Sequence, residues 1–119
     1  MRETVLIVDD HAAYRVAVRL LLEADGFEVV GECRNGEDAL AQVVQLQPRV
    51  VLLDVQLPGM DGFAVAEHLA TFAAVAVILI SSRDADAYGG LVAATPCAGF
   101  LAKSRLSGAA IRALLACVE

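Results

Sequence analysis

Short apolar runs alternate with longer amphipathic segments along the whole chain. Five of the runs have the length of a strand and are mostly apolar or β-branched, which is typical of strands buried on both faces of a sheet. Strands are therefore expected at Val5–Val8, Val29–Val30, Val50–Leu53, Val75–Ile80 and Phe100–Ala102. Because segments of helix length separate these runs, the pattern predicts parallel strands joined by crossover helices.

The separating segments carry apolar residues at helical spacing. Helices are expected at Ala12–Ala24, Gly36–Leu46, Gly62–Leu69, Asp84–Ala94 and Gly108–Val118.

Three of these helices carry further signals. In the first, Val16, Leu20 and Leu21 are expected to form the apolar stripe. The fourth contains Gly89-Gly90, and since each glycine costs about 1 kcal/mol relative to alanine, we expect a frayed or mobile helix there. Ser107 precedes the last helix and is expected to cap its N-terminus.

Five strand-helix units with right-handed crossovers predict a doubly wound α/β fold. The expected architecture is a three-layer (βα)5 sandwich whose five-stranded parallel sheet has the order 2-1-3-4-5. At 119 residues the chain has room for one domain of ordinary size, so a single domain over residues 1–119 is expected. In folds of this class the ligand crevice lies at the carboxyl ends of the strands.

Charge and hydrophobicity narrow the range of partners. Fifteen Asp and Glu residues against nine Lys and Arg give a formal net charge of -6, which argues against direct binding of nucleic acid through its phosphates. The longest apolar stretches, such as Ala73–Ile80, are far shorter than the roughly 20 residues of a membrane-spanning helix. A cytoplasmic protein with no membrane contact is expected.

The three cysteines form no recognisable motif. Cys33, Cys97 and Cys117 are odd in number and widely spaced, with neither a CxxC pair nor nearby histidines that would suggest a zinc site. We expect them to be reduced and buried.

Acidic residues follow two of the predicted strands. The first strand is followed by Asp9 and Asp10, and the third by Asp54. If these strands are neighbours, the three carboxylates repel one another unless a divalent cation neutralises them. Ligands that are all oxygen favour a hard ion, so the sequence predicts a Mg2+ site.

The other two strand ends supply a hydroxyl group and a cation. Ser81 and Ser82 follow the fourth strand, and Lys103, the only lysine of the chain, follows the fifth. A carboxylate nucleophile at Asp54, a Mg2+ ion, a hydroxyl group at Ser81 and an ammonium group at Lys103 suit phosphoryl transfer to an aspartate.

Several residues near these strand ends have simpler interpretations. Asp61, directly before Gly62, is expected to cap the third helix rather than bind metal. Ser82 is interpreted as a turn residue, His11 as a neighbour of the site rather than a base, and His68 as a solvent-facing side chain.

Four ordered blocks of sequence closely resemble the receiver domain of two-component response regulators, and the resemblance spans the whole chain. The blocks are Val5–His11, Leu52–Gly62, Ile80–Ser82 and Gly99–Lys103. The resemblance implies that Asp54 is the phospho-acceptor and that the domain, although not a classical enzyme, catalyses its own phosphorylation and dephosphorylation at this residue.

The same resemblance assigns roles to the residues around Asp54. It implies that Asp9 and Asp10 hold Mg2+ and that the backbone carbonyl group of Gln56 completes the metal shell. Lys103 becomes the partner of the phosphoryl group. A further pair, Ser81 and Phe100, becomes the switch hydroxyl group and the rotating aromatic side chain.

Partners and output also follow from the resemblance. A sensor histidine kinase or a small phosphodonor is expected to supply the phosphoryl group. The pairs Asp10-His11 and Lys103-Ser104 are most similar to receivers of the NarL/LuxR type, which precede a helix-turn-helix domain. A truncated transcription regulator is therefore expected, with a stand-alone receiver acting through protein contacts as the alternative. Ser104 stands where many receivers have proline, so no cis peptide bond is expected there.

A surface for partners is also expected. Phosphorylation should be read out on the face formed by Asp84–Ala94, Phe100–Ala102 and Gly108–Val118, where a partner or a second copy of the chain would bind.

Other functional classes remain open at this stage. Flavodoxin-like electron carriers share the fold, but two carboxylates in the first loop would repel the phosphate of a flavin. Haloacid-type phosphatases use Asp-x-Asp rather than the adjacent pair Asp9-Asp10. A module that acts without phosphorylation would not need the full set of acceptor, metal and lysine residues.

Overall fold

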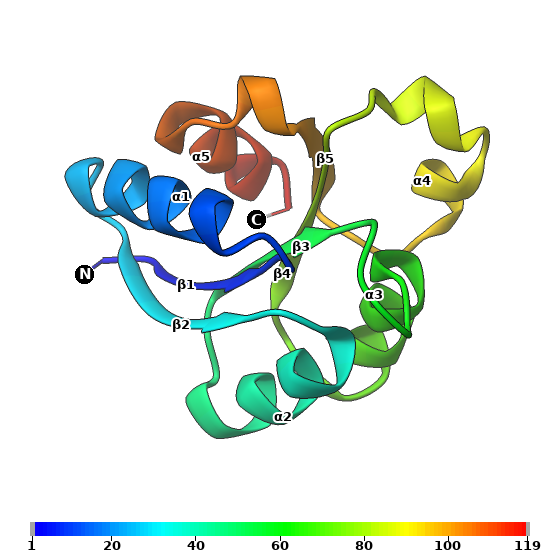
Figure 1. Ribbon diagram of the computed structural model, residues 1–119, viewed down its shortest axis with the longest axis horizontal. Helices are drawn as coiled ribbons and strands as arrows, with labels where there is room; N and C mark the ends of the chain where they lie inside the picture. Colours follow the sequence, from blue (N-terminus) through cyan, green and yellow to red (C-terminus); the bar gives the residue numbers. More distant parts are fainter. Residues whose placement is uncertain (1, 119) are drawn as a thin grey trace.

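A computed structural model describes residues 2–118, which form a parallel sheet with helices on both faces (Figure 1). The strand order is β2-β1-β3-β4-β5, and all four neighbouring pairs are parallel. The predicted doubly wound (βα)5 topology is therefore confirmed. The strands are β1 (Thr4–Val8), β2 (Glu28–Cys33), β3 (Val50–Asp54), β4 (Ala76–Ser81) and β5 (Gly99–Ala102).

The helices form two layers around this sheet. Helices α1 and α5 cover one face, and α2 and α3 cover the other (Figure 1). Their bounds are α1 (Ala12–Ala24), α2 (Gly36–Leu46), α3 (Gly62–Phe72), α4 (Leu91–Ala94) and α5 (Gly108–Val118). Two short 3-10 helices, η1 (Ala85–Tyr88) and η2 (Lys103–Arg105), lie before α4 and after β5.

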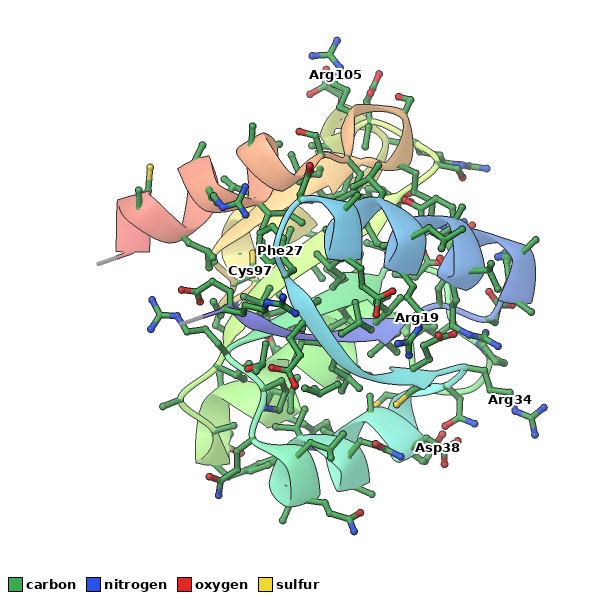
Figure 2. All side chains as sticks on the ribbon, turned by 90° about the vertical axis from the view of Figure 1, so that its left-hand side faces the viewer. Arg19, Phe27, Arg34, Asp38, Cys97 and Arg105 are labelled. Carbon is green, nitrogen blue, oxygen red and sulfur yellow. The ribbon has the colours of Figure 1, made fainter. Side chains whose placement is uncertain are left out.

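Two apolar cores follow from the alternation of side chains along the strands. In β1, Leu6 and Val8 face α2 and α3, whereas Val5 and Ile7 face α1 and α5, and all four are fully buried. Figure 2 shows Phe27, which is 1% exposed, inside the second of these cores, while Arg105 projects outward. Strands buried on both faces explain the continuous apolar runs of the sequence.

The predicted apolar stripe of α1 is wrong. Val16 and Leu20 are 56% and 65% exposed and Leu21 is 38% exposed, whereas Val18 and Leu22 are the buried positions. The helix is apolar around most of its circumference, so the sequence pattern alone could not select the side that faces the sheet.

The predicted helix Asp84–Ala94 is interrupted in its middle. Gly89 adopts φ 59° and ψ -128°, a conformation that side-chain-bearing residues avoid. The chain therefore forms the one-turn helix η1, turns at Gly89, and forms the single turn α4. Neither of these two turns contains a buried residue.

Predicted helix caps are confirmed at two positions. The side chain of Asp61 accepts a hydrogen bond from the backbone N–H of Ala64 at 2.9 Å, and Ser107 accepts one from Ala110 at 3.0 Å. Gly62 begins α3 so close to β3 that a Cβ atom there would overlap the backbone oxygen of Asp54. This close approach ties the start of α3 to the end of β3. The third helix continues to Phe72, three residues beyond the prediction.

The remaining sequence predictions have mixed outcomes. All three cysteines are free, as predicted. Cys33 is buried as predicted, but Cys97 is half-buried and Cys117 is exposed. Within residues 2–118 there is no cis peptide bond, including at Ser104. No helix in this part of the chain is both long and apolar enough to cross a membrane.

Candidate functional site

Four predicted residues meet at the carboxyl edge of the sheet. Asp9 follows β1, Asp54 ends β3, Ser81 ends β4 and Lys103 follows β5. Asp9, Asp54 and Ser81 are all at most 3% exposed. Since β1 and β4 both pair with β3, strands far apart in the sequence place these polar side chains together.

Lys103 bridges the two buried carboxylates. Its Nζ atom lies 2.6 Å from Oδ2 of Asp9 and 3.1 Å from Oδ2 of Asp54. Burial acts to lower the pKa of Lys103, but the hydrogen bond to Asp9 and the charge of Asp54 outweigh it and raise the pKa. Lys103 is therefore held in its charged form.

The two buried carboxylates differ in how well their charges are compensated. Burial acts to raise the pKa of Asp9, but hydrogen bonds from Lys103 and from the backbone of His11 hold that pKa below its usual value. Burial raises the pKa of Asp54, and the charge of Asp9 adds to this effect. The charge of Asp54 is therefore the less well compensated of the two.

The imidazole of His11 lies beside the three carboxylates that were predicted to bind metal. Asp9, Asp10, Asp54 and His11 each offer one ligand atom, and these atoms all lie within 4.8 Å of one another. The cluster holds three carboxylates, and the ammonium group of Lys103 contacts two of them, Asp9 and Asp54, so an excess of negative charge is left that a divalent cation would neutralise. The cluster fits Mg2+, because its donors are mainly carboxylate oxygens.

Gln56 contacts Asp54 through its backbone. Its N–H donates to Oδ1 of Asp54 at 3.1 Å, and its side chain is exposed. This contact orients the carboxylate of Asp54. The metal-binding role of the Gln56 carbonyl group stays a prediction.

Tyr88, a residue that the sequence analysis missed, links Ser81 to Phe100. The Ser81 hydroxyl group lies 2.5 Å from the hydroxyl group of Tyr88 and accepts the backbone N–H of Arg83 at 3.0 Å. The ring of Tyr88 packs edge-on against Phe63 and Phe100, with centroids 5.5 Å and 6.2 Å apart. Tyr88 lies in the segment that was expected to form a frayed helix, and the structure places it at the end of η1, where its hydroxyl group reaches Ser81 of β4.

Tyr14 is a second missed neighbour of the site. The Nζ atom of Lys103 lies 4.5 Å from the centre of its ring, which is a cation–π contact. Among residues 2–118, the Tyr14 hydroxyl group is buried without a hydrogen-bond partner. Burial and the charges of Asp9 and Asp54 raise the pKa of Tyr14 to about 12, so this hydroxyl group stays neutral.

Residues interpreted as structural lie outside the cluster. Asp61 caps α3 and His68 is exposed, as predicted, and Ser82 lies at an exposed bend that follows β4. His11 is closer than expected, because its imidazole contacts the carboxylates of Asp9 and Asp10.

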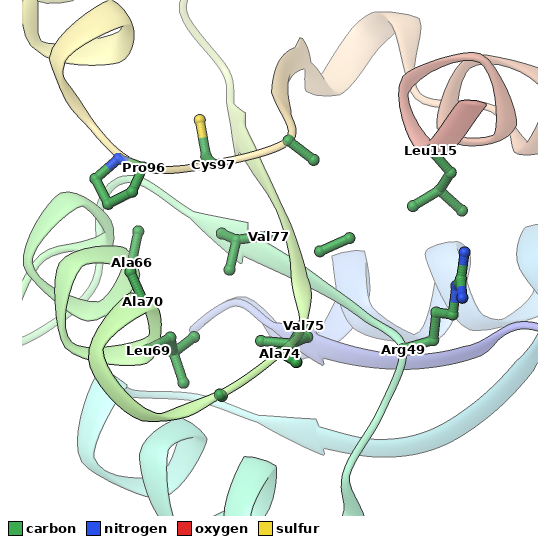
Figure 3. Close-up of a pocket in the computed structure, with 13 residues that line it drawn as sticks. Arg49, Ala66, Leu69, Ala70, Ala74, Val75, Val77, Pro96, Cys97 and Leu115 are labelled. Carbon is green, nitrogen blue, oxygen red and sulfur yellow. The ribbon is translucent and has the colours of Figure 1, made fainter. Parts of the chain in front are cut away.

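A cavity of about 470 Å³ lies at the opposite edge of the sheet (Figure 3). It is lined mainly by small apolar residues of α3 and of the segments that precede β4 and β5, including Ala66, Leu69 and Cys97. None of the residues of the carboxylate cluster lines it. The cavity is therefore separate from the candidate site.

Comparisons with known proteins point to one family. The family model of the response regulator receiver domain matches residues 5–115. The transcription regulator BvgA of Bordetella pertussis is 36% identical over 104 residues, which cover 87% of this chain and 50% of BvgA. A protein-glutamate methylesterase/protein-glutamine glutaminase of Moorella thermoacetica is 49% identical over 82 residues, covering 68% of this chain and 19% of that protein.

A solved structure agrees with these relatives. The signal receiver domain of the response regulator NarL from Mycobacterium tuberculosis matches with a TM-score of 0.84 and 35% identity, covering 98% of this chain and 95% of that domain. This chain spans at most half the length of BvgA and of the methylesterase. Fold, carboxylate cluster and family match agree, and the chain belongs to the response regulator receiver family.

Proposed function

We propose that this receiver is a phosphorylation-activated signalling switch whose acceptor is Asp54. The observation that carries the proposal is the bridge of Lys103 between the buried carboxylates of Asp9 and Asp54. An ammonium group held 3.1 Å from the acceptor carboxylate lies where it can neutralise the oxygens of an incoming phosphoryl group.

The transfer needs few protein groups. A carboxylate oxygen of Asp54 attacks phosphorus, the new O–P bond forms as the bond to the donor breaks, and the leaving group departs with that electron pair. Lys103 neutralises phosphoryl oxygens, and Ser81 donates its hydroxyl hydrogen to one of them. Asp9, Asp10, Asp54 and the Gln56 carbonyl group would hold Mg2+, which supplies further charge neutralisation when bound.

The phosphorylation test uses the isolated chain with acetyl phosphate and Mg2+, read by intact mass. We expect one phosphoryl group on the wild-type protein, none on Asp54→Asn, and none with excess EDTA. Asp61→Asn is the matched control, because it changes a carboxylate that caps α3 outside the cluster, and it should be phosphorylated like the wild type. Equal labelling of Asp54→Asn would contradict the assignment.

Family membership and relatives support a class of phosphodonor and a class of output for this receiver. Membership of the family supports a cognate histidine kinase as the donor. The match to BvgA supports transcription control through a further DNA-binding domain, whereas the match to the methylesterase shows that similar receivers also occur in proteins with other activities. Reading the gene beyond codon 119 tests the output directly, since a helix-turn-helix domain supports transcription control and its absence contradicts it.

The signal would leave the site through Ser81 and Phe100. A phosphoryl group that takes the Ser81 hydroxyl hydrogen competes with Tyr88, whose ring packs against Phe100. The face formed by α4, β5 and α5 would then change and bind a partner or a second copy of the chain. Light scattering with and without beryllofluoride, a stable phosphoryl mimic, tests the homodimer, and an unchanged mass contradicts it.

A further inference from the structure

His11 lies over the carboxylates of the site rather than away from them. It precedes the first residue of α1, and its backbone N–H donates to Oδ1 of Asp9 at 2.8 Å. Its Nδ1 atom lies 3.1 Å from Oδ1 of Asp9 and 3.1 Å from Oδ1 of Asp10. One imidazole nitrogen therefore faces two of the oxygens expected to hold the metal ion.

We propose that Nδ1 of His11 is a ligand of the divalent cation, so that this receiver binds transition-metal ions such as Mn2+ and Co2+ through a mixed nitrogen and oxygen site. The inference rests on the metal site of the proposed function and concerns which ions that site accepts. Imidazole binds the first-row transition metals with an affinity that rises from Mn2+ to Co2+, whereas Mg2+ prefers oxygen.

The separations of the ligand atoms suit an octahedral ion. Adjacent ligands at about 2.1 Å from such an ion lie about 3.0 Å apart, and opposite ligands about 4.2 Å apart. Nδ1 of His11 is 3.1 Å from each of its two carboxylate oxygens, and the whole group of four ligand atoms lies within 4.8 Å. Shifts of well under 1 Å would close the group around one ion.

The position of His11 is fixed while its ring stays accessible. The guanidinium group of Arg15 donates to the backbone oxygen of Asp9 at 2.6 Å, which ties the first turn of α1 to the end of β1. The side chain of His11 is 69% exposed and that of Asp10 is 38% exposed. An ion can therefore reach these ligands from solvent.

A neutral imidazole ligand should raise the affinity for some divalent ions more than for others. It adds a coordinate bond without adding negative charge, so it strengthens binding of ions that accept nitrogen ligands and contributes little to Mg2+. A carboxylate, in contrast, attracts every divalent cation. Loss of His11 and loss of Asp10 should therefore have different patterns across a series of ions.

The test measures Mg2+, Mn2+ and Co2+ binding to the metal-free full chain by calorimetry at pH 7.5, with wild type, His11→Asn and Asp10→Asn. His11→Asn keeps a short polar side chain that can donate to the carboxylates but lacks the imidazole. We expect it to weaken Co2+ binding about tenfold or more and Mn2+ binding by a smaller factor, with Mg2+ affinity within about twofold of wild type. Asp10→Asn should weaken all three ions.

A matched variant and a spectroscopic readout complete the test. His68→Ala removes the other histidine, which is exposed on α3, and should leave all affinities unchanged. Electron spin echo spectra of the Mn2+ complex should show coupling to an imidazole nitrogen in wild type and His68→Ala and none in His11→Asn.

Two results would overturn the inference. One is an unchanged Co2+ and Mn2+ affinity in His11→Asn, and the other is an equal loss for all ions, which would mean that His11 only positions the carboxylates. Either result leaves phosphorylation of Asp54 in Mg2+ intact. Failure of the proposed metal site itself would differ, because no ion would then bind the wild-type protein.

Discussion

Lys103 compensates the negative charges of the buried carboxylates Asp9 and Asp54. Its ammonium group is the cation within hydrogen-bonding distance of both Asp9 and Asp54, and Asp9 is completely buried. Removing one partner of a buried ion pair leaves the other charge uncompensated. We expect Lys103→Met to lower the free energy of unfolding at pH 7 by about 3 kcal/mol, measured by urea denaturation.

The pH dependence of this loss distinguishes electrostatics from packing. In the wild type the pKa of Asp9 is lowered, so its contribution to stability is present above the ordinary pKa and is lost as the pH falls through the lowered value. Without Lys103, burial raises this pKa, so the destabilisation of Lys103→Met should shrink as the pH falls toward 4. Arg105→Met, which removes an exposed cation, should change stability by less than about 0.5 kcal/mol, and a pH-independent loss in Lys103→Met would contradict the argument.

The buried, ionised carboxylate of Asp54 is expected to lower the free energy of unfolding. Burial raises its pKa, so its ionised form lowers the stability of the folded state above that raised value. Asp54→Asn should increase the free energy of unfolding at pH 7 by about 1 kcal/mol, because Lys103 keeps its contact with Asp9. The gain should vanish as the pH falls below the ordinary pKa of 3.8, and an equal gain at every pH would contradict this explanation.

The Tyr88 hydroxyl group can accept the Ser81 hydroxyl hydrogen that the phosphoryl group is expected to use. Its own hydroxyl group lies 2.5 Å from that of Ser81. Tyr88→Phe keeps the ring packing but frees Ser81, so we expect beryllofluoride to bind several-fold more tightly, measured by titration at saturating Mg2+. Tyr14→Phe is the control, because the Tyr14 hydroxyl group has no hydrogen-bond partner to release. Equal affinities of wild type and Tyr88→Phe would contradict the competition.

Among the elements, η1 and α4 contain no buried residue, and two adjacent glycines between them should affect stability in opposite ways. Gly89 has φ 59°, so Gly89→Ala should strain the backbone and lower the free energy of unfolding by about 1 kcal/mol. Gly90 has φ -85° and open space around it, so Gly90→Ala should raise it by about 0.5 kcal/mol. Urea denaturation of both variants measures the two signs, and effects of the same sign would contradict the role of the turn at Gly89.

The sequence predicted some elements more accurately than others. Strands buried on both faces are continuous apolar runs, so their positions were predicted within a few residues, and the cap residues Asp61 and Ser107 marked helix starts correctly. The orientation of α1 was wrong because Val16 and Leu20 are as apolar as the buried Val18 and Leu22. A glycine pair showed that α4 is weak, but only the backbone conformation of Gly89 showed where it breaks.

At the scale of the whole molecule, the candidate site was predictable where it depends on strand order. Parallel strands end at the same edge, so Asp9, Asp54, Ser81 and Lys103 could be placed together from the sequence. Tyr14 and Tyr88 could not be, because both belong to segments whose inward-facing side is set by packing and turns. Only the structure adds these residues to the site.

A phosphoryl mimic on Asp54 should change the molecule unevenly. The path from Asp54 runs through Ser81 to Tyr88, and Tyr88 packs against Phe63 of α3 and Phe100 of β5. Neither η1 nor α4 has a buried residue, so a small change in the partners of Ser81 should redistribute conformations there more readily than in α1 or α2. We expect amide hydrogen exchange to change most over residues 82–98 when beryllofluoride and Mg2+ are added.

Asp54→Asn with the same additions is the control for this exchange experiment, because it keeps the fold but lacks the acceptor carboxylate, and it should show no change. Tyr88→Phe separates the path from the site, since it should still bind the mimic but change less between residues 82 and 98. Changes confined to the loops after β1 and β3 would mean that binding at Asp54 stays local and that the face of α4, β5 and α5 does not carry the signal.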